Sequence, residues 1–421
     1  MSKNTNIYAG TPILGQLLDF FPKELFEKSV SQFDSDSAHR TVDTWHQFAF
    51  MAYGILTGSA TLREIGKNLS IFGPNLAQCR IKSIPAKSSI SDANRVRNAD
   101  VFGDFYLRLY EHYRSYLSDS YLNMPINGEI DPKMVEIFDS TTVSLFVDVY
   151  KNTGRIPENG HVKGGVKAFS KMILSERVPN FICLNHATTN EKKFLDTFRL
   201  TPGSFGVFDK GFISYEKYQE WTDADVYFVT RMADNAKFKI IENQELEFKA
   251  EDGVMQDADI ELTYYSKKLK KKQTVIVRMI AYIDPLNGNK YVYLTNNQTI
   301  KPLTICLLYK NRWTIEPLFK QIKQNFELTY FLTDSKEGIK TQIWIAMILN
   351  LIFTVIHKMI KECEDFSTMV KIVAKNTTNY INFIVFLKEP KVLFRPKKKN
   401  IEIVQYNLFE KVKGGGFKKY G

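Results

Sequence analysis

The stretch Ile137-Phe138-Asp139-Ser140-Thr141 places an acid inside an apolar, β-branched run that predicts a central strand. The same arrangement returns in Val207-Phe208-Asp209-Lys210-Gly211, where the acid follows a second apolar strand and precedes a glycine. A carboxylate in such a place costs free energy unless it is paired or bound to a metal ion. Either aspartate alone could simply cap a turn. Two of them, joined by a third acid, indicate a metal-dependent active site.

The third acid lies in the stretch 309–323, which predicts a helix. A turn of about 100° per residue puts four polar side chains on one narrow stripe of that helix: Tyr309, Arg312, Glu316 and Lys323. The stripe extends over about 21 Å, a length suited to following a phosphate backbone. A charged face open to solvent is the alternative, but the apolar face beside it favours partial burial. Pro317 removes a helical donor, so the helix either kinks there or restarts with Thr314 as its cap.

Length and charge limit the class of protein. The 421 residues suffice for two or three domains, and 57 basic against 46 acidic residues give a net charge of +11. This charge favours nucleic acid as a partner, although a merely soluble basic protein is the alternative. The scattered cysteines and histidines exclude zinc fingers and a disulfide scaffold. No signal peptide begins the sequence, and the apolar stretch 343–356 is short of the roughly twenty residues needed to cross a bilayer. We therefore expect a cytoplasmic protein without a membrane partner, in which 343–356 is a buried core helix.

The first segment, residues 1–125, has apolar residues at helical spacing and predicts an all-helical N-terminal DNA-binding domain. A helix-turn-helix candidate consists of a helix over 44–57, a break at Gly58, and a capping box from Thr61 to Glu64. Farther on, a helix capped within 88–91 carries Arg95 and Arg97, which are candidates for contacts with phosphates or base edges. An ordinary helical bundle with a solvated polar face is the alternative.

The rest of the chain divides into four further segments. Residues 126–233 combine strands, among them 134–138 and 141–149, with helices such as 191–198, which predicts an α/β sheet. Residues 234–300 form a β-rich insertion with a turn at 287–289. Helices resume over 301–387, and residues 388–421 form a basic, flexible tail.

The motifs around Asp139 and Asp209, together with the Tyr-x2-Arg-x3-Glu-x6-Lys pattern of 309–323, resemble the DDE transposases of bacterial insertion sequences. Within that group the pattern is similar to the branch named after insertion sequence four, and the resemblance covers residues 131–360. It implies an RNase H-like α/β catalytic core, with a β-rich domain inserted between the second aspartate and the glutamate. It also implies that Asp139, Asp209 and Glu316 hold two Mg²⁺ ions, for which Mn²⁺ substitutes.

The activity implied by the resemblance is DNA cleavage at the ends of an element, followed by strand transfer into target DNA. The implied partners are the terminal inverted repeats, target DNA and a second copy of the chain in a synaptic homodimer. The family motif implies phosphate contacts by Arg312, Lys323 and the hydroxyl of Tyr309. Weaker candidates for DNA contacts are Arg231, Lys163 and Lys167.

Two other functions compete with this interpretation. A haloacid-dehalogenase-type phosphohydrolase also places an aspartate at a strand end, but it needs a second aspartate at the position of Thr141. A transposase-derived DNA-binding protein without catalytic activity is the other alternative, and the presence of all three acids argues against it.

Overall fold

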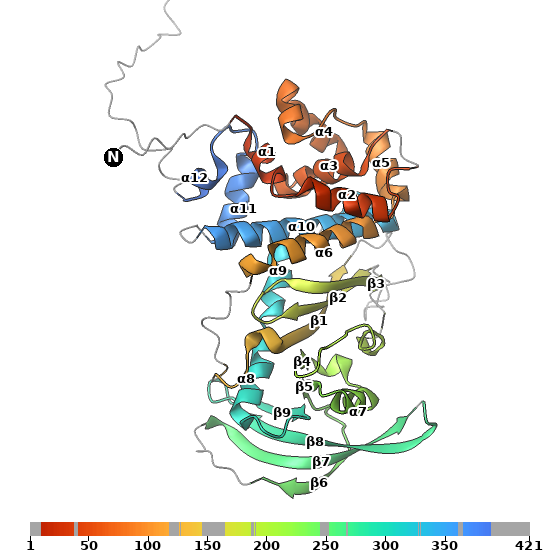
Figure 1. Ribbon diagram of the computed structural model, residues 1–421, viewed down its shortest axis with the longest axis vertical. Coiled ribbons are helices and arrows are strands. Elements are labelled where there is room, and N and C mark those ends of the chain that lie inside the picture. Colours follow the sequence, from red (N-terminus) through yellow and green to blue (C-terminus); the bar gives the residue numbers. More distant parts are fainter. Residues whose placement is uncertain are drawn as a thin grey trace, which may run out of the picture.

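The structure is a computed structural model that describes residues 10–37, 41–117, 126, 128–144, 165–186, 189, 191–244, 252–266, 268–326, 328, 330–360 and 365–388. A layer of helices lies at one end of the molecule, and a long mixed sheet extends away from it (Figure 1). Residues 389–421 of the basic tail and Lys163 lie outside the described residues, whereas Lys388 belongs to the last described helix.

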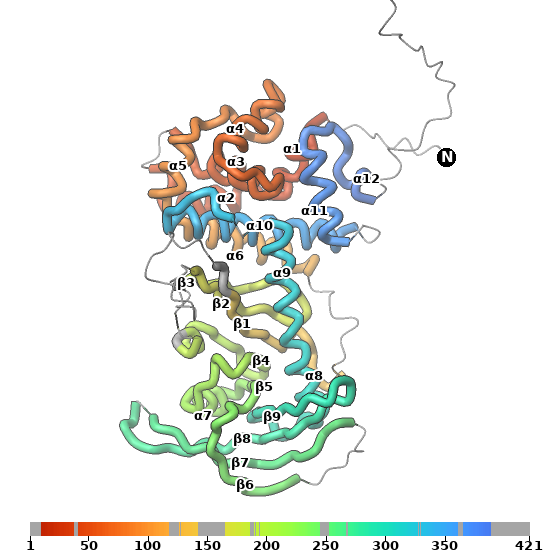
Figure 2. The backbone as a smooth tube through the Cα atoms, turned by 180° about the vertical axis from the view of Figure 1, so that it is seen from behind, coloured from red at the N-terminus to blue at the C-terminus, as the bar shows by residue number. Residues whose placement is uncertain are grey.

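The helical layer combines the N-terminal part of the chain with its C-terminal helices. The first group is α1 (Ile13–Leu18), α2 (Lys23–Gln32), α3 (Thr44–Thr57), α4 (Leu62–Ser70), the 3-10 helix η1 (Gly73–Cys79), α5 (Lys87–Val96) and α6 (Asp100–Leu117). The second group is α10 (Lys336–Met359), α11 (Phe366–Lys375) and α12 (Phe383–Lys388). Buried side chains from both groups belong to one continuous hydrophobic core. The N-terminal helices therefore pack directly on the C-terminal ones, as both views show (Figures 1 and 2).

Helix α10 is the centre of this layer. It runs beside α6 and separates the upper helices from the sheet (Figure 1). Among the described residues it is the one helix long and apolar enough to cross a membrane by length and composition, and 89% of its most apolar window is buried inside the protein. The packing is close, since a Cβ atom on Gly103 of α6 would lie 2.8 Å from the indole of Trp344. The expectation of a buried core helix is confirmed.

The predicted helix pair α3 and α4 is also present. Gly58 ends α3 in the left-handed conformation, with φ at 66°, which glycine adopts without strain. The Thr61 hydroxyl accepts a hydrogen bond from the backbone N–H of Glu64 at 3.1 Å, and the Glu64 carboxylate accepts one from Ala60 at 2.9 Å. The capping box thus forms, but the Glu64 carboxylate accepts from the N–H of Ala60, one residue before the N-cap residue Thr61. Helix α5, by contrast, begins at Lys87 after Ala86, without the predicted serine cap.

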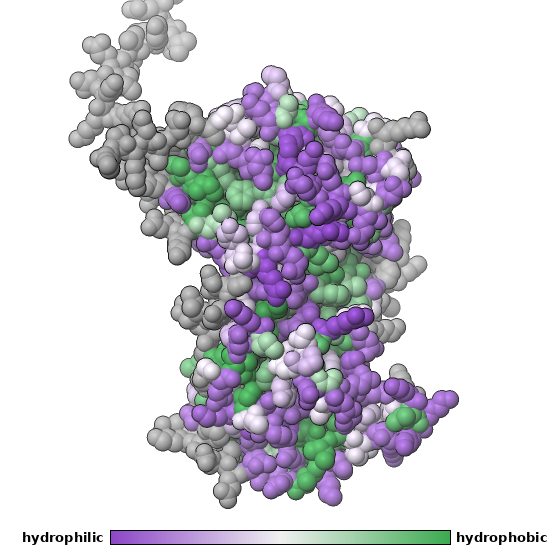
Figure 3. Space-filling view, in the orientation of Figure 1, coloured by the Kyte–Doolittle hydropathy of each residue, from purple (hydrophilic) through white to green (hydrophobic). Residues whose placement is uncertain are grey.

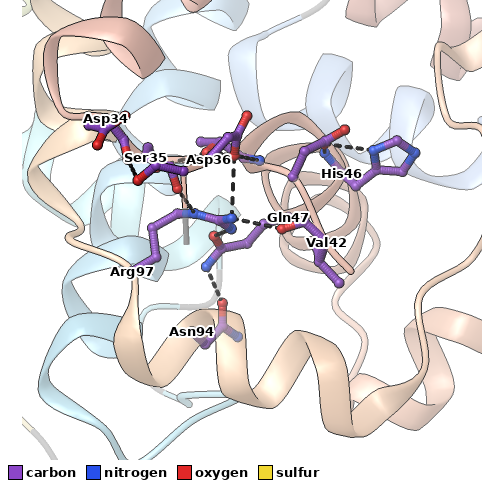
Figure 4. A network of polar contacts seen from close by, with 11 residues as sticks. Asp34, Ser35, Asp36, Val42, His46, Gln47, Asn94 and Arg97 are labelled. Atoms are coloured by element: carbon purple, nitrogen blue, oxygen red, sulfur yellow. Dashed lines mark hydrogen bonds and ion pairs between the residues drawn. The ribbon is translucent and has the colours of Figure 1, made fainter. Parts of the chain in front are cut away.

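Arg97 has a structural role that the sequence pattern did not indicate. Its side chain is 1% exposed and lies at the centre of a polar network between helices (Figure 4). The guanidinium donates to the carbonyls of Ser35 and Val42, to the side-chain oxygen of Gln47, and forms an ion pair with Asp36 at 3.4 Å. A buried guanidinium needs such partners to offset the loss of hydration. Arg97 therefore holds the helices together and does not face a solvent-borne ligand.

The nine strands of the described sheet are β1 (Val135–Ser144), β2 (Gly165–Ile173), β3 (Pro179–His186), β4 (Phe205–Phe208), β5 (Tyr227–Arg231), β6 (Phe238–Asn243), β7 (Val254–Ser266), β8 (Lys271–Ile283) and β9 (Lys290–Thr295). Their order is β3-β2-β1-β4-β5-β9-β8-β7-β6. Strands β1, β4 and β5 pair in parallel, and the other pairings are antiparallel.

Short helices complete the sheet region: η2 (Pro132–Met134), η3 (Glu191–Phe194), η4 (Lys210–Phe212) and α7 (Tyr215–Asp223). Two predictions for this region were wrong. The strands predicted over 134–138 and 141–149 are joined, from Val135 to Ser144, into one strand, β1, because antiparallel pairing with β2 continues through Asp139; residues 145–149 lie outside the described residues. The helix predicted over 191–198 is only the 3-10 turn η3.

The β-rich insertion extends the same sheet, since β9 pairs with β5. A buried ion pair connects the insertion to the helix that comes after it. The Arg278 guanidinium forms two hydrogen bonds with Asp257, at 2.9 and 2.7 Å, and donates to the carbonyls of Asn297 and Ile300. These carbonyls precede α8 (Pro302–Arg312), so the insertion fixes the start of that helix. The far edge of the insertion shows apolar side chains at the lower end of Figure 3, where β6 and β7 lie.

The two arginines of α5 and its C-cap form a matched pair for testing the network of Arg97. Replacing Arg97 with Met should lower the free energy of unfolding by about 2–4 kcal/mol, because the carbonyl and amide acceptors around it become unsatisfied. Replacing Arg95 with Met should change it by less than about 0.5 kcal/mol, because Arg95 is exposed and, within the described ranges, its ion pair is with the exposed Asp92. Urea unfolding followed by circular dichroism measures both. Equal effects of the two substitutions would contradict the assigned role.

Candidate active site

Asp139 and Asp209 become neighbours through the parallel pairing of β1 with β4. The pairing ends at Phe138 opposite Phe208, and the next residue on each strand is the aspartate. Strand β4 stops there, whereas β1 continues, so Asp139 lies within a strand and Asp209 directly after one. The preceding phenylalanines are fully buried and stack with ring centroids 5.9 Å apart. This packing fixes the position from which both carboxylates emerge.

Glu316 is supplied to the same site by a helix that follows the β-rich insertion. Helix α8 ends at Arg312, and α9 (Ile315–Asn325) begins after Thr314, with Glu316 and Pro317 in its first turn. Proline is tolerated there because the first turn has no intrahelical acceptors for its N–H groups. The predicted restart of the helix is therefore correct, and the kink is not required. Thr314 contributes no side-chain cap to α9.

The three carboxylates line one cleft of about 470 Å³. Its other described lining residues are Ser140, Thr141, Arg312, Phe319, Lys320, Lys323 and Gln324. Strand β1, the end of β4 and the two helices of the signature thus supply a single concave site. In the sequence, the three acids could be assigned to one site only through the family resemblance. In the structure, the packing of the sheet against helices α8 and α9 places them in one cleft.

Tyr309 supports the second aspartate. Its side chain is fully buried, packs on Tyr293 of β9 at 4.9 Å, and its hydroxyl donates to Asp209 at 2.9 Å. Burial and the nearby Asp209 raise the pKa of Tyr309 far above its ordinary value, so the phenol remains a donor. In this structure the hydroxyl orients Asp209, and a phosphate contact by Tyr309 stays a prediction.

Arg312 lies between the other two acids. Its guanidinium donates to Glu316 at 3.2 Å and lies 3.8 Å from Asp139, with 6% of the residue exposed. The guanidinium also lies over the ring of Tyr309, at 5.4 Å from its centroid. The Nε atom of Arg312 is buried and has no hydrogen-bond partner among the described residues. Arg312 thus balances the negative charge of the cleft, and its buried Nε donor has no acceptor among the described residues.

Burial raises the pKa of Asp139 to about 6, although the Arg312 cation opposes this shift. The carboxylates of Glu316 and Asp209 raise it further by like-charge repulsion. An acid with such a pKa is held in an unfavourable environment for its charged form. A bound cation would relieve that cost, which is typical of functional sites.

The remaining predicted DNA contacts fall into different places. The Lys323 ammonium lies in the cleft and donates to the Thr141 hydroxyl at 2.8 Å. Arg231 ends β5, next to the end of β4, with its guanidinium 5.1 Å from the ring of Tyr291. Arg95 is exposed near the helix pair of the N-terminal part. Lys167 does not face solvent: it is 5% exposed, so the expectation of a DNA contact there is corrected.

Lys167 reveals a residue that the sequence did not single out. The carboxylate of Glu191 accepts hydrogen bonds from the Lys167 ammonium at 2.6 Å and the Ser140 hydroxyl at 2.7 Å. A Cβ atom on Gly211 would lie only 1.7 Å from the same carboxylate. Glu191 therefore fills the space between the residue after Asp139 and the turn after Asp209. Nothing in its spacing from either aspartate signals this, because the contact is made across the sheet.

The site offers only oxygen donors to a metal ion, and this is the donor set that Mg²⁺ prefers. Among the described residues, however, no three His, Cys, Asp or Glu side chains are already close enough to hold one ion. Glu316 is turned toward Arg312, and its side chain is 57% exposed. Burial therefore does not hold the Glu316 side chain in this position.

The raised pKa of Asp139 predicts a cost in stability. Its native pKa, about 6, exceeds its ordinary value of 3.8, so the folded state binds more protons between these values. Stability should therefore fall as the pH rises from about 4 to 6 and stay low above that. Replacing Asp139 with Asn should raise the free energy of unfolding at pH 7.5, without metal, by on the order of 3 kcal/mol, and change it little near pH 4. Thermal unfolding at both pH values measures this; a variant that is less stable at pH 7.5 contradicts it.

Comparison with known proteins identifies two matching families and several similar proteins. The pattern of the family described as "Transposase DDE domain" matches residues 131–351, and a "Domain of unknown function (DUF4372)" matches residues 9–79. A Sinorhizobium fredii protein named as transposase y4zB is 28% identical over 217 residues, which cover 51% of this chain and 58% of that protein. A Synechocystis protein named as a transposase for insertion sequence element IS4SA is 23% identical over 270 residues, covering 63% and 70%.

A solved structure of a piggyBac transposase synaptic complex with hairpin DNA aligns with 94% of this chain and 84% of that chain, at 12% identity and a TM-score of 0.44. The family match spans more than half of the sequence and contains all three acids of the cleft. The chain belongs to the transposase DDE domain family.

Proposed function

We propose that the protein is a DNA transposase that cleaves the ends of an insertion sequence and transfers them into target DNA. The observation that carries this proposal is the cleft in which Asp139, Asp209 and Glu316 meet, beside the cations Arg312 and Lys323. Carboxylates that can bind metal ions and cationic side chains that can bind phosphate therefore line the same concave surface. This combination suits an attack on a phosphodiester.

The topology supports an RNase H-like core. Three antiparallel strands, β3, β2 and β1, continue into the parallel strands β4 and β5, and the first two acids emerge from β1 and β4. Helices α8 and α9 then supply the third acid. In such an arrangement the sheet positions two of the ligands, Asp139 and Asp209. The helix supplies the third, Glu316, whose side chain changes its orientation.

Asp139, Asp209 and Glu316 would hold two Mg²⁺ ions, or Mn²⁺ in their place. When bound, such ions supply an activated water or 3′-hydroxyl and stabilise the departing oxygen in an in-line displacement. The all-oxygen donor set and the raised pKa of Asp139 fit a dication. The turn of Glu316 away from Arg312 completes the ligand set.

The other residues of the cleft position the reacting groups. Tyr309 fixes the orientation of Asp209 through its hydroxyl. When Glu316 turns away, the N–H donors of Arg312 that pointed at it become free to bind a phosphate oxygen. The planar guanidinium suits such a contact. Lys323 adds a second cation at the Thr141 side of the cleft. Burial lowers the pKa of Lys323, and a phosphate close by would favour its charged form again.

Transposition needs two DNA ends, and each chain has one such cleft among its described residues. We therefore propose a homodimer that binds the terminal inverted repeats and target DNA in the cytoplasm. The net charge of +11 is consistent with a polyanionic partner. The alternative, a DNA-binding protein without catalysis, differs only in the chemistry of the cleft.

Replacing Glu316 with Gln tests the catalytic assignment. The substitution keeps shape and removes the charge, so DNA cleavage in Mg²⁺ should fall by about a thousandfold or more, because a metal ligand is lost. DNA binding should persist. The control is Glu242→Gln, an exposed position on β6, which should retain full cleavage. Retained cleavage by the Glu316 variant would end the assignment, and a wild-type protein that binds DNA without cutting it would favour the alternative.

Tyr309→Phe tests orientation separately from ligation. Loss of the hydrogen bond to Asp209 should weaken metal affinity by roughly 10- to 100-fold, as is typical when a group that orients a ligand is removed. The Mn²⁺ concentration for half-maximal cleavage should rise accordingly, and cleavage at saturating Mn²⁺ should largely recover. An unchanged metal requirement would show that the phenol acts elsewhere, for example on the DNA.

A further inference from the structure

A second, basic cleft lies next to the catalytic one. It has a volume of about 230 Å³ and is formed where α3, α9 and α11 meet. Its described lining residues are Ile55, Leu56, Thr57, Gly58, Gln324, Asn325, Val370, Lys371, Ala374 and Lys375. None of them is acidic, and two are lysines. We call it the α11 cleft.

The two clefts are joined along α9. Gln324 lines both of them, and Lys320 and Lys323 precede it on the same helix. From Glu316 to Asn325 the helix advances about 14 Å, which corresponds to roughly four base pairs of duplex DNA. Figure 2 shows α9 running from the sheet to the helical layer, where α11 lies beside it. A backbone leaving the catalytic cleft along α9 would therefore arrive at the α11 cleft.

The lysines of the α11 cleft are held on a rigid base. On α11, Met369, Val370 and Val373 are buried in the hydrophobic core. The Asn325 side chain donates to the Ser367 hydroxyl at 3.1 Å and ties α9 to α11. The position of α11 relative to the catalytic helix is thus fixed by apolar packing and a hydrogen bond.

Lys371 and Lys375 lie one helical turn apart, on one exposed face of α11. Like charges at this spacing repel each other. Neither forms an ion pair with a residue that the structure describes. Two such cations beside the turn that ends α3 are suited to an anionic chain with regular spacing.

We propose that the α11 cleft binds the phosphate backbone of duplex DNA beside the cleavage site, with Lys371 and Lys375 as the contacts. The inference rests on the proposed function, since the same duplex must occupy both clefts. It assigns α11 and the α3–α4 turn to a track that guides DNA from the helical layer to the acids. The contact is sequence-independent, because phosphates carry no base identity.

The test compares two double variants of the full chain. Lys371→Ala with Lys375→Ala should weaken binding to a blunt duplex of about 30 base pairs by at least roughly tenfold near 0.1 M salt, and lower the slope of log affinity against log salt by about 2. The matched control, Lys239→Ala with Lys290→Ala, also removes two exposed charges, from β6 and β9, and should have a much smaller effect. Fluorescence anisotropy without divalent metal measures both.

Arginine at both positions should restore affinity, since the charge rather than the packing is required. Thermal unfolding of all variants shows that the fold is unchanged. If the slope of log affinity against log salt were equal for the wild type and for the variant lacking Lys371 and Lys375, the proposed DNA contact at the α11 cleft would be wrong. The catalytic proposal would remain intact. A wild-type protein that does not bind duplex DNA would overturn the proposed function as well.

Discussion

Parallel hydrogen bonding between β1 and β4 is the constraint on which the site depends. It aligns Phe138 with Phe208, so that the residue after each phenylalanine, Asp139 or Asp209, emerges at the same edge of the sheet. The stacked phenylalanines beneath them belong to a buried aromatic cluster. A slip of register by one residue would turn one acid to the opposite face of the sheet. The apolar core therefore sets the spacing of the charged groups.

The third acid depends on a longer chain of contacts. The buried pair of Arg278 and Asp257 holds the loop before α8, and Tyr309 on α8 packs against β9 and bonds to Asp209. Helix α9 then continues from the catalytic cleft to the helical layer, where it packs against α10 and α11. The β-rich insertion consequently acts as a scaffold for the catalytic helix. The N-terminal helices share a hydrophobic core with α10, so the helical layer and the active site are mechanically connected.

Much of this was predictable from local patterns. The apolar run around Asp139, the capping box at Thr61 and the restart of the helix near Pro317 each follow from short-range backbone chemistry. The roles of Arg97, Lys167 and Tyr309 were not predictable, because a cation or a phenol looks the same in sequence whether it faces solvent or a buried partner. Glu191 escaped notice for a similar reason: its contacts with Ser140 and Gly211 form across the sheet. Distance in sequence carries no information about such pairs.

The central claim is that three acids from distant parts of the chain converge on divalent cations. A crystal structure of the protein with duplex DNA and Mn²⁺, using anomalous scattering to locate the metal, tests it most directly. We predict anomalous peaks between the carboxylates of Asp139, Asp209 and Glu316, with Arg312 turned away from Glu316. Fully bound DNA with no metal in this cleft, or with Glu316 still paired to Arg312 and the metal elsewhere, would contradict the account.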